Sequence, residues 1–132
     1  MPKTVKISTE VYCTLQIEGQ HCWLKCPFAE VKYLRHPHRH LFHIKATKKV
    51  THDDRDVEFI LLKHKIENYF YEEYFDSDIQ MMNFESMSCE MIAKELITKF
   101  NLLRCEVSED GENGAIVSVT GIVTDGNHIV SP

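Results

Sequence analysis

The sequence is poor in the residues that break chains or link domains, with only five glycines and four prolines among 132 residues. This scarcity excludes a long disordered linker. The length is typical of one domain, so residues 1–132 are expected to form a single domain. With 43% hydrophobic and 27% charged residues, the chain is long enough to bury a core of its own.

An excess of positive charge is also lacking, since 15 Lys and Arg stand against 20 Asp and Glu and the formal net charge is −5 with histidines neutral. A nucleic-acid polymer requires a basic surface, so it is not an expected partner, whereas a small anionic ligand stays compatible with the charge. No stretch reaches membrane-spanning length, and the first four residues contain no apolar signal run. A membrane is therefore not an expected partner either.

The five cysteines form no evident disulfide framework, and their number is odd. A reducing, cytoplasmic location is therefore expected. Free cysteines are commonly small buried hydrophobes, so most of the five are expected to have no chemistry. They are Cys13, Cys22, Cys26, Cys89 and Cys105.

The hydrophobic pattern predicts four strands and two helices. Alternation of apolar and polar residues predicts strands over about 3–18, 35–50, 103–108 and 115–123. Apolar residues at helical spacing predict helices over about 57–72 and 87–100. Residues 73–85 are interpreted as a polar connection, and the tail from 124 onward is expected to be loose.

Local signals place the ends of these elements. One of Asp53, Asp54 and Asp56 is expected to cap the first helix, and Ser86 the second. Asp-Gly and Asn-Gly within residues 109–114 both favour a hairpin.

The order strand, strand, helix, helix, strand, strand predicts an α+β fold. Hairpins at both ends favour an antiparallel four-stranded sheet with both helices on one face. The outer strands leave unpaired edges, which self-association would cover.

Four of the eight histidines lie in residues 36–43. On a strand, His36, His38 and His40 would leave the same face. A His-x-His pair on a strand presents two imidazoles to one metal ion, although a solvated strand edge has the same composition.

Five segments together resemble the 6-pyruvoyl-tetrahydropterin synthase and 6-carboxy-tetrahydropterin synthase family. They match, in chain order, a histidine ending the first strand, a His-Gly-His motif, the opening of each helix and the end of the third strand. The segments are Ile17–His21, His38–His40, Val57–Lys63, Met87–Ala93 and Val107–Asp110.

The resemblance implies the tunnelling fold, in the order ββααββ, and a ring-shaped homo-oligomer with pockets between subunits. It also implies a zinc site of three histidines, His21, His38 and His40. Three imidazoles with an open position form a catalytic type of zinc site, which polarises a bound hydroxyl or carbonyl.

The resemblance further implies a pterin- or purine-type ligand, a nucleotide-like small molecule. Glu109 would anchor the N–H/NH₂ edge of its ring, since a carboxylate accepts two hydrogen bonds from such an edge. The backbone near Ser88 and Cys89 would hold the same ring.

Two family features are missing. The cysteine that carries a proton in the family would lie near Leu34, and residues 71–78 contain no histidine to activate it. An altered base could be Cys26, His36 or an acid from residues 72–78. Arg39 replaces the glycine between the two metal histidines, and its cation could meet a phosphate.

Two classes of function follow. One is a diverged protein that binds or sequesters a nucleotide-derived small molecule; the other is an active pterin-synthase-like lyase acting on dihydroneopterin triphosphate. A third interpretation is a small zinc module built from Cys22, Cys26, His38 and His40. That module ranks last because the long strands and two helices exceed what it needs.

Overall fold

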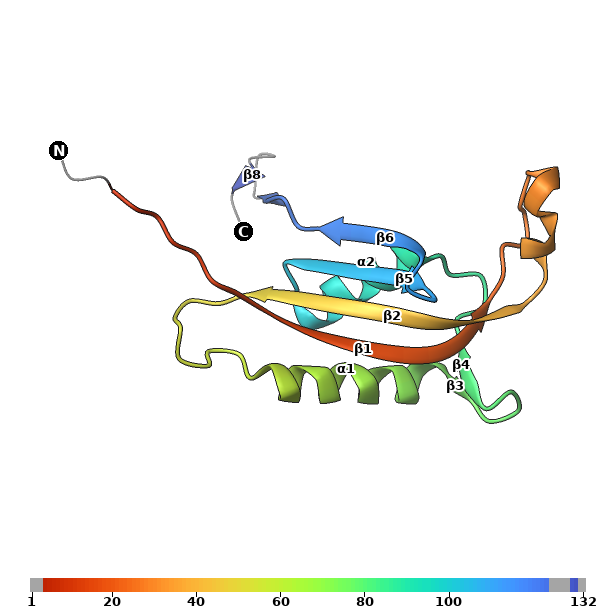
Figure 1. The fold of residues 1–132 in the computed structure, drawn as a ribbon, viewed down its shortest axis with the longest axis horizontal. Coiled ribbons are helices and arrows are strands. Elements are labelled where there is room, and N and C mark those ends of the chain that lie inside the picture. The colour runs from red at the N-terminus through yellow and green to blue at the C-terminus, as the bar shows by residue number, and fades with distance from the viewer. Residues whose placement is uncertain (1–3, 124–128, 131–132) are drawn as a thin grey trace.

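The computed structural model describes residues 4–123 and 129–130 and has an α+β architecture (Figure 1). A six-stranded sheet has the strand order β3-β4-β1-β2-β5-β6. Its two long central strands, β1 and β2, are antiparallel along their whole length. The elements are β1 Glu10–His21, a 3-10 helix Ala29–Arg35, β2 His38–Lys49, α1 Phe59–Tyr74, β3 Phe75–Asp76, β4 Met81–Asn83, α2 Cys89–Phe100, β5 Arg104–Glu109 and β6 Asn113–Ser118.

The α+β class is confirmed, but the four-stranded antiparallel sheet is wrong in number and in direction. Strands β3 and β4 form within the segment interpreted as a polar connection, and β4 runs parallel to β1, which makes the sheet mixed. Met82 on β4 and Phe84 just after it are buried. Burial of these two side chains favours a strand here despite the polar residues around them.

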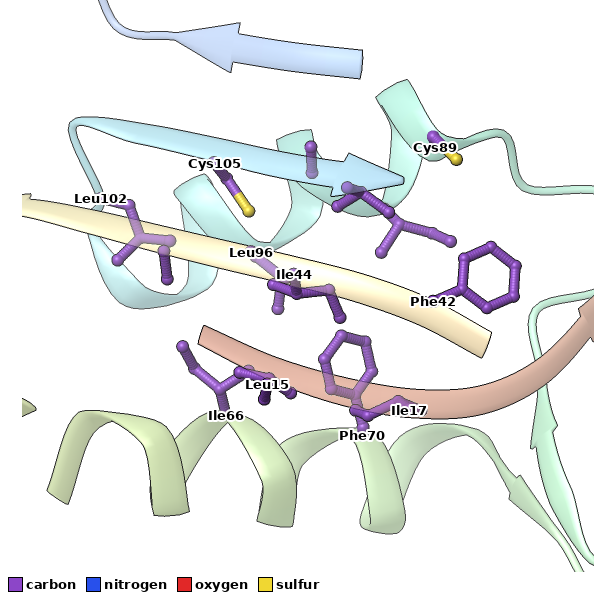
Figure 2. Packing of buried hydrophobic residues seen from close by; sticks show 14 of the residues in the cluster. Leu15, Ile17, Phe42, Ile44, Ile66, Phe70, Cys89, Leu96, Leu102 and Cys105 are labelled. Atoms are coloured by element: carbon purple, nitrogen blue, oxygen red, sulfur yellow. The ribbon is translucent and has the colours of Figure 1, made fainter. Parts of the chain in front are cut away.

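One face of the sheet carries the core, which lies between the strands and the helices (Figure 2). Leu15 is paired with Ile44 across β1 and β2, and Ile44 with Val107 across β2 and β5. Alternation places all three on the same face. The helices contribute Leu62, Ile66, Phe70, Ile92, Ala93 and Leu96 to the same cluster.

The first strand begins later than the sequence pattern predicts. Alternation starts at residue 3, yet β1 begins at Glu10, the residue that pairs with the last residue of β2. Val5 and Ile7 are 72% and 84% exposed. In the described part of the chain no strand pairs with Val5 or Ile7, so the alternation alone does not make a strand there.

Both helices are confirmed, but neither predicted cap is correct. Glu58 caps α1 by accepting from the Ile60 N–H, whereas Asp56 accepts from Thr51 instead. Ser88, not Ser86, caps α2 by accepting from the Met91 N–H at 3.2 Å. The cap of α2 therefore lies two residues further along the chain than the composition indicates.

The Asp-Gly signal forms the turn between β5 and β6. Asp110 and Gly111 both have positive φ, at 58° and 72°, which a tight hairpin requires. A separate two-stranded sheet pairs β7 Ile122–Val123 with β8 Ile129–Val130. The tail from 124 onward is expected to be loose, but Ile129 and Val130 belong to this small sheet. The rest of that tail, residues 124–128 and 131–132, lies outside the described residues.

Within residues 4–123 and 129–130, no helix has both the length and the apolar character needed to cross a membrane.

Candidate metal centre

Three histidines meet at one end of the core-bearing sheet face. His21 ends β1 and pairs directly with His38, the first residue of β2. His40 lies two residues further along β2, so its side chain leaves the same face. The ring centroids of His21 are 4.6 Å from His38 and 5.3 Å from His40, and the two β2 rings are 5.0 Å apart. One ring nitrogen of each histidine lies within 4.8 Å of the others, so the group could hold a metal ion.

Each of the three rings is fixed through its Nδ1 atom. His21 Nδ1 lies 2.8 Å from the Met87 carbonyl oxygen, and His38 Nδ1 lies 2.8 Å from that of His36. His40 Nδ1 lies 2.7 Å from Asp110 Oδ2. A carbonyl oxygen only accepts, so Nδ1 must carry the proton in the first two rings. Nε2 is then the free nitrogen, which is how metal-binding histidines are commonly oriented.

Two of the free nitrogens are buried. Among the described residues, His21 Nε2 and His40 Nε2 have no hydrogen-bond partner. His21 is only 8% exposed, and this burial lowers the pKa of its imidazole below the ordinary value, which favours the neutral, metal-binding form. Buried polar atoms are rarely left without a partner, so these two atoms mark a site that is completed by something else.

Two consecutive acids border the histidines. Glu109 Oε2 lies 2.9 Å from His21 Nε2, and Glu109 Oε1 lies 3.5 Å from His40 Nε2. Asp110 accepts from the Leu41 N–H at 2.9 Å as well as from His40. These hydrogen bonds, the backbone one foremost, hold the pKa of Asp110 below its usual range. The site thus combines three imidazole rings with two carboxylates beside them.

A cavity of about 410 Å³ opens beside the histidines. Both polar and apolar groups line it, which is typical of small-molecule sites. The polar lining includes Glu109 and the start of α2, and the apolar lining includes Trp23, Leu34 and Met91.

The structure brings most of the predicted ligand-binding residues to this cavity. Ser88 lines it, and the Cys89 thiol lies 3.9 Å from Glu109 Oε2. Burial, reinforced by Glu109, raises the pKa of the Cys89 thiol to about 12, so this cysteine stays protonated. Arg39 lies apart, on the opposite face of β2, where its Nε is 2.9 Å from Glu18 Oε1.

The two candidate catalytic residues do not join the histidines. Cys26 is fully buried under the 3-10 helix, with its sulfur nearest the Phe28 and Val31 carbonyls. His36 is exposed and precedes β2, so it contributes a carbonyl to His38 rather than a ring to the cluster. No cysteine belongs to the metal-binding group within the described residues, which does not favour the small zinc module.

Sequence reasoning missed three contributors. Cys22 and Trp23 line the cavity because the Trp23 N–H donates to the Leu34 carbonyl at 2.6 Å and closes the loop. Asp110 reaches His40 across the β5–β6 turn. The proximity of Trp23 to His21 in sequence could have indicated the first pair, whereas the Asp110 contact depends on strand register.

No protein-family model matches the chain, and no curated protein matches it.

Proposed function

We propose that the protein binds one zinc ion through His21, His38 and His40. The observation that carries this proposal is the common anchoring of the three rings by Nδ1, with two buried Nε2 atoms lacking a partner among the described residues. Imidazole nitrogen is a preferred zinc ligand. When bound, zinc would supply a Lewis acid at the cavity wall.

We propose further that the cavity takes a planar nitrogen heterocycle of the pterin or purine type. A carboxylate, Glu109, and an aromatic side chain, Trp23, both line it. The carboxylate suits an N–H/NH₂ edge, and an aromatic side chain suits the ring. The suggestion of a pterin comes from the family resemblance and the tunnelling fold that it implies.

Binding is favoured over turnover. Neither Cys26, nor His36, nor an acid from residues 72–78 lines the cavity, so the three kinds of altered base considered from the sequence are missing from its lining. One observation supports a lyase as the second candidate: Cys22 is partly exposed and lines the cavity. A thiol there could carry a proton. Conversion of dihydroneopterin triphosphate by the zinc-loaded protein, abolished in Cys22→Ser, would favour the lyase.

Elemental analysis of the purified, untagged protein tests the metal. We expect about one zinc per chain, lost in His38→Ala and kept in His43→Ala, which alters the opposite face of the same strand. A metal-free protein after purification in zinc-containing buffer would refute the zinc site.

Fluorescence tests the ring ligand, because Trp23 is the single tryptophan of the sequence and lines the cavity. We expect pterin to quench the emission of the zinc-loaded protein in a saturable manner. Equal quenching of wild-type protein by pterin and by a saturated ring compound would contradict selective ring binding.

The sheet edges support self-association into a ring. β6 and β3 are the outer strands of the six-stranded sheet, and Ile116 on β6 is 65% exposed. Unpaired edges are available for pairing with another chain. Native mass spectrometry is expected to show a closed homo-oligomer, and a monomer at micromolar concentration would refute the ring.

A further inference from the structure

The carboxylate of Glu109 occupies an unusual place in the histidine cluster. Its two oxygens approach two different ring nitrogens, at 2.9 Å from His21 Nε2 and 3.5 Å from His40 Nε2. Neither approach has the geometry of a hydrogen bond, since both nitrogens lack a partner within the described chain. The side chain of Glu109 is 28% exposed, so water only partly screens the contact.

In the His21 and His40 rings, the ring proton lies on Nδ1, the nitrogen that faces away from Glu109. Nδ1 of His21 faces the Met87 carbonyl and Nδ1 of His40 faces the Asp110 carboxylate, and both are acceptors. In the neutral ring Nε2 then carries a lone pair. A lone pair facing a carboxylate oxygen at this distance is repulsive unless a proton or a metal cation lies between the two atoms.

The spacing fits a metal ion as that cation. With metal–nitrogen and metal–oxygen bonds of about 2.0–2.2 Å, two ligand atoms of a tetrahedral zinc site lie about 3.3 Å apart. The two distances from Glu109 lie on either side of this value. The register explains the placement: Glu109 pairs with Phe42, two residues from His40 on the same face of β2.

We propose that Glu109 is the fourth ligand of the resting metal site, completing a His₃Glu centre with His21, His38 and His40. This inference rests on the proposed zinc site but assigns Glu109 a second role. Four protein ligands close a zinc site, whereas three leave a position open. An oxygen of Glu109 bound to the metal is a weaker acceptor for a ring edge, so metal binding and ring binding are expected to compete for this carboxylate.

Metal titration of Glu109→Gln tests this assignment. Glu106→Gln is the matched control, because Glu106 lies on the same strand with its side chain on the opposite face. We expect Glu109→Gln to weaken zinc binding by at least about tenfold, since even changes behind the ligands cost 10- to 100-fold. The control is expected to bind zinc as the wild type does. Glu109→Ala serves as a second variant because an amide oxygen can itself approach a metal.

Cobalt(II) supplies a direct spectroscopic readout. We expect the visible bands of the Co²⁺-loaded protein to shift in Glu109→Gln and Glu109→Ala but not in Glu106→Gln. Unchanged zinc affinity and an unchanged cobalt spectrum in both Glu109 variants would overturn the fourth-ligand assignment and leave the three-histidine site standing. A wild-type protein that binds neither metal would overturn the proposed zinc site itself.

Discussion

The sheet face that carries the core has a hydrophobic end and a histidine-rich end. Along β2 the residues on this face run from Ala46 through Ile44 and Phe42 to His40 and His38. The first three are fully or almost fully buried in the core, whereas the two histidines are partly exposed. The same alternation therefore builds a dry core at one end and a polar cluster at the other.

Phe42 marks the boundary between the two ends. Its ring packs edge-on against His21 and His40, and also against Phe84. Gly19, paired with His40, makes room for this arrangement, because a Cβ there would meet the Phe84 ring at 2.7 Å. The core thus supplies one wall of the candidate metal centre, so we expect stability and metal binding to be coupled at Phe42 but not deeper in the core.

Truncation of the boundary residue should have the largest effect. Phe42→Ala is expected to lower the free energy of unfolding of the metal-free protein by about 3–5 kcal/mol, the usual cost of removing a buried phenylalanine. Urea denaturation measures this cost. Zinc affinity should fall too, because the His21 and His40 rings lose the ring that packs against them.

Ile44→Ala is the matched comparison, two residues along the same face. It should cost about 2–5 kcal/mol of stability and leave zinc affinity unchanged. If Phe42→Ala does not fold, the same two measurements can be made on Phe42→Leu, which keeps an apolar side chain at this position. If the variants at both positions change zinc affinity equally, the boundary role of Phe42 is wrong.

Removal of a proposed metal ligand should have the opposite pattern of effects, with a large loss of zinc affinity and little loss of stability. His38→Ala is expected to reduce zinc affinity more than the roughly 10- to 100-fold cost of changes behind the ligands. The free energy of unfolding without metal should change by only about 0.5 kcal/mol, as for most partly exposed positions.

Urea denaturation with and without zinc measures both quantities. At a free zinc concentration of 100 times Kd, the wild type should gain about 2.7 kcal/mol, and His38→Ala should gain almost none. A large loss of stability in metal-free His38→Ala would show that the site end also holds the fold together.

Asp110 should have an intermediate effect because it acts through His40. Asp110→Asn is expected to weaken zinc binding by about 10- to 100-fold, since a carboxylate behind a histidine fixes the ring and raises its basicity. Zinc titration against a competing chelator measures the change. Glu112→Gln, in the same turn, is the control for loss of charge, and equal affinities for both variants would contradict the positioning role.

The sequence pattern predicts the core end of the face better than the site end. Alternation correctly predicts strands that include β1 and β2, although it starts the first one too early, and the His-x-His spacing correctly places His38 and His40 on the same face. These inferences need only local periodicity. The sequence pattern does not predict β4 because its three residues are too few to show an alternation of apolar and polar side chains.

The surroundings of the histidines depend on contacts that local patterns do not encode. His21 is fixed by the carbonyl of Met87, 66 residues away, and His40 by Asp110, 70 residues away. A backbone carbonyl has no residue signature, and the Asp110 contact follows from a turn with positive φ together with the β2–β5 register. The three histidines of the candidate site were therefore predictable from the sequence, whereas the groups that orient them were not.

The smallest expected effect concerns the cap of α2, at the edge of the cavity. Ser88→Ala should lower the free energy of unfolding by about 1 kcal/mol, because the Met91 N–H loses its acceptor. Zinc affinity should stay unchanged, since Ser88 lies outside the histidine group. Ser86→Ala, the exposed position favoured by composition alone, should change neither quantity. Equal costs for the two variants in urea denaturation would contradict the cap assignment, whereas a drop in zinc affinity for Ser88→Ala would extend the metal centre to the start of α2.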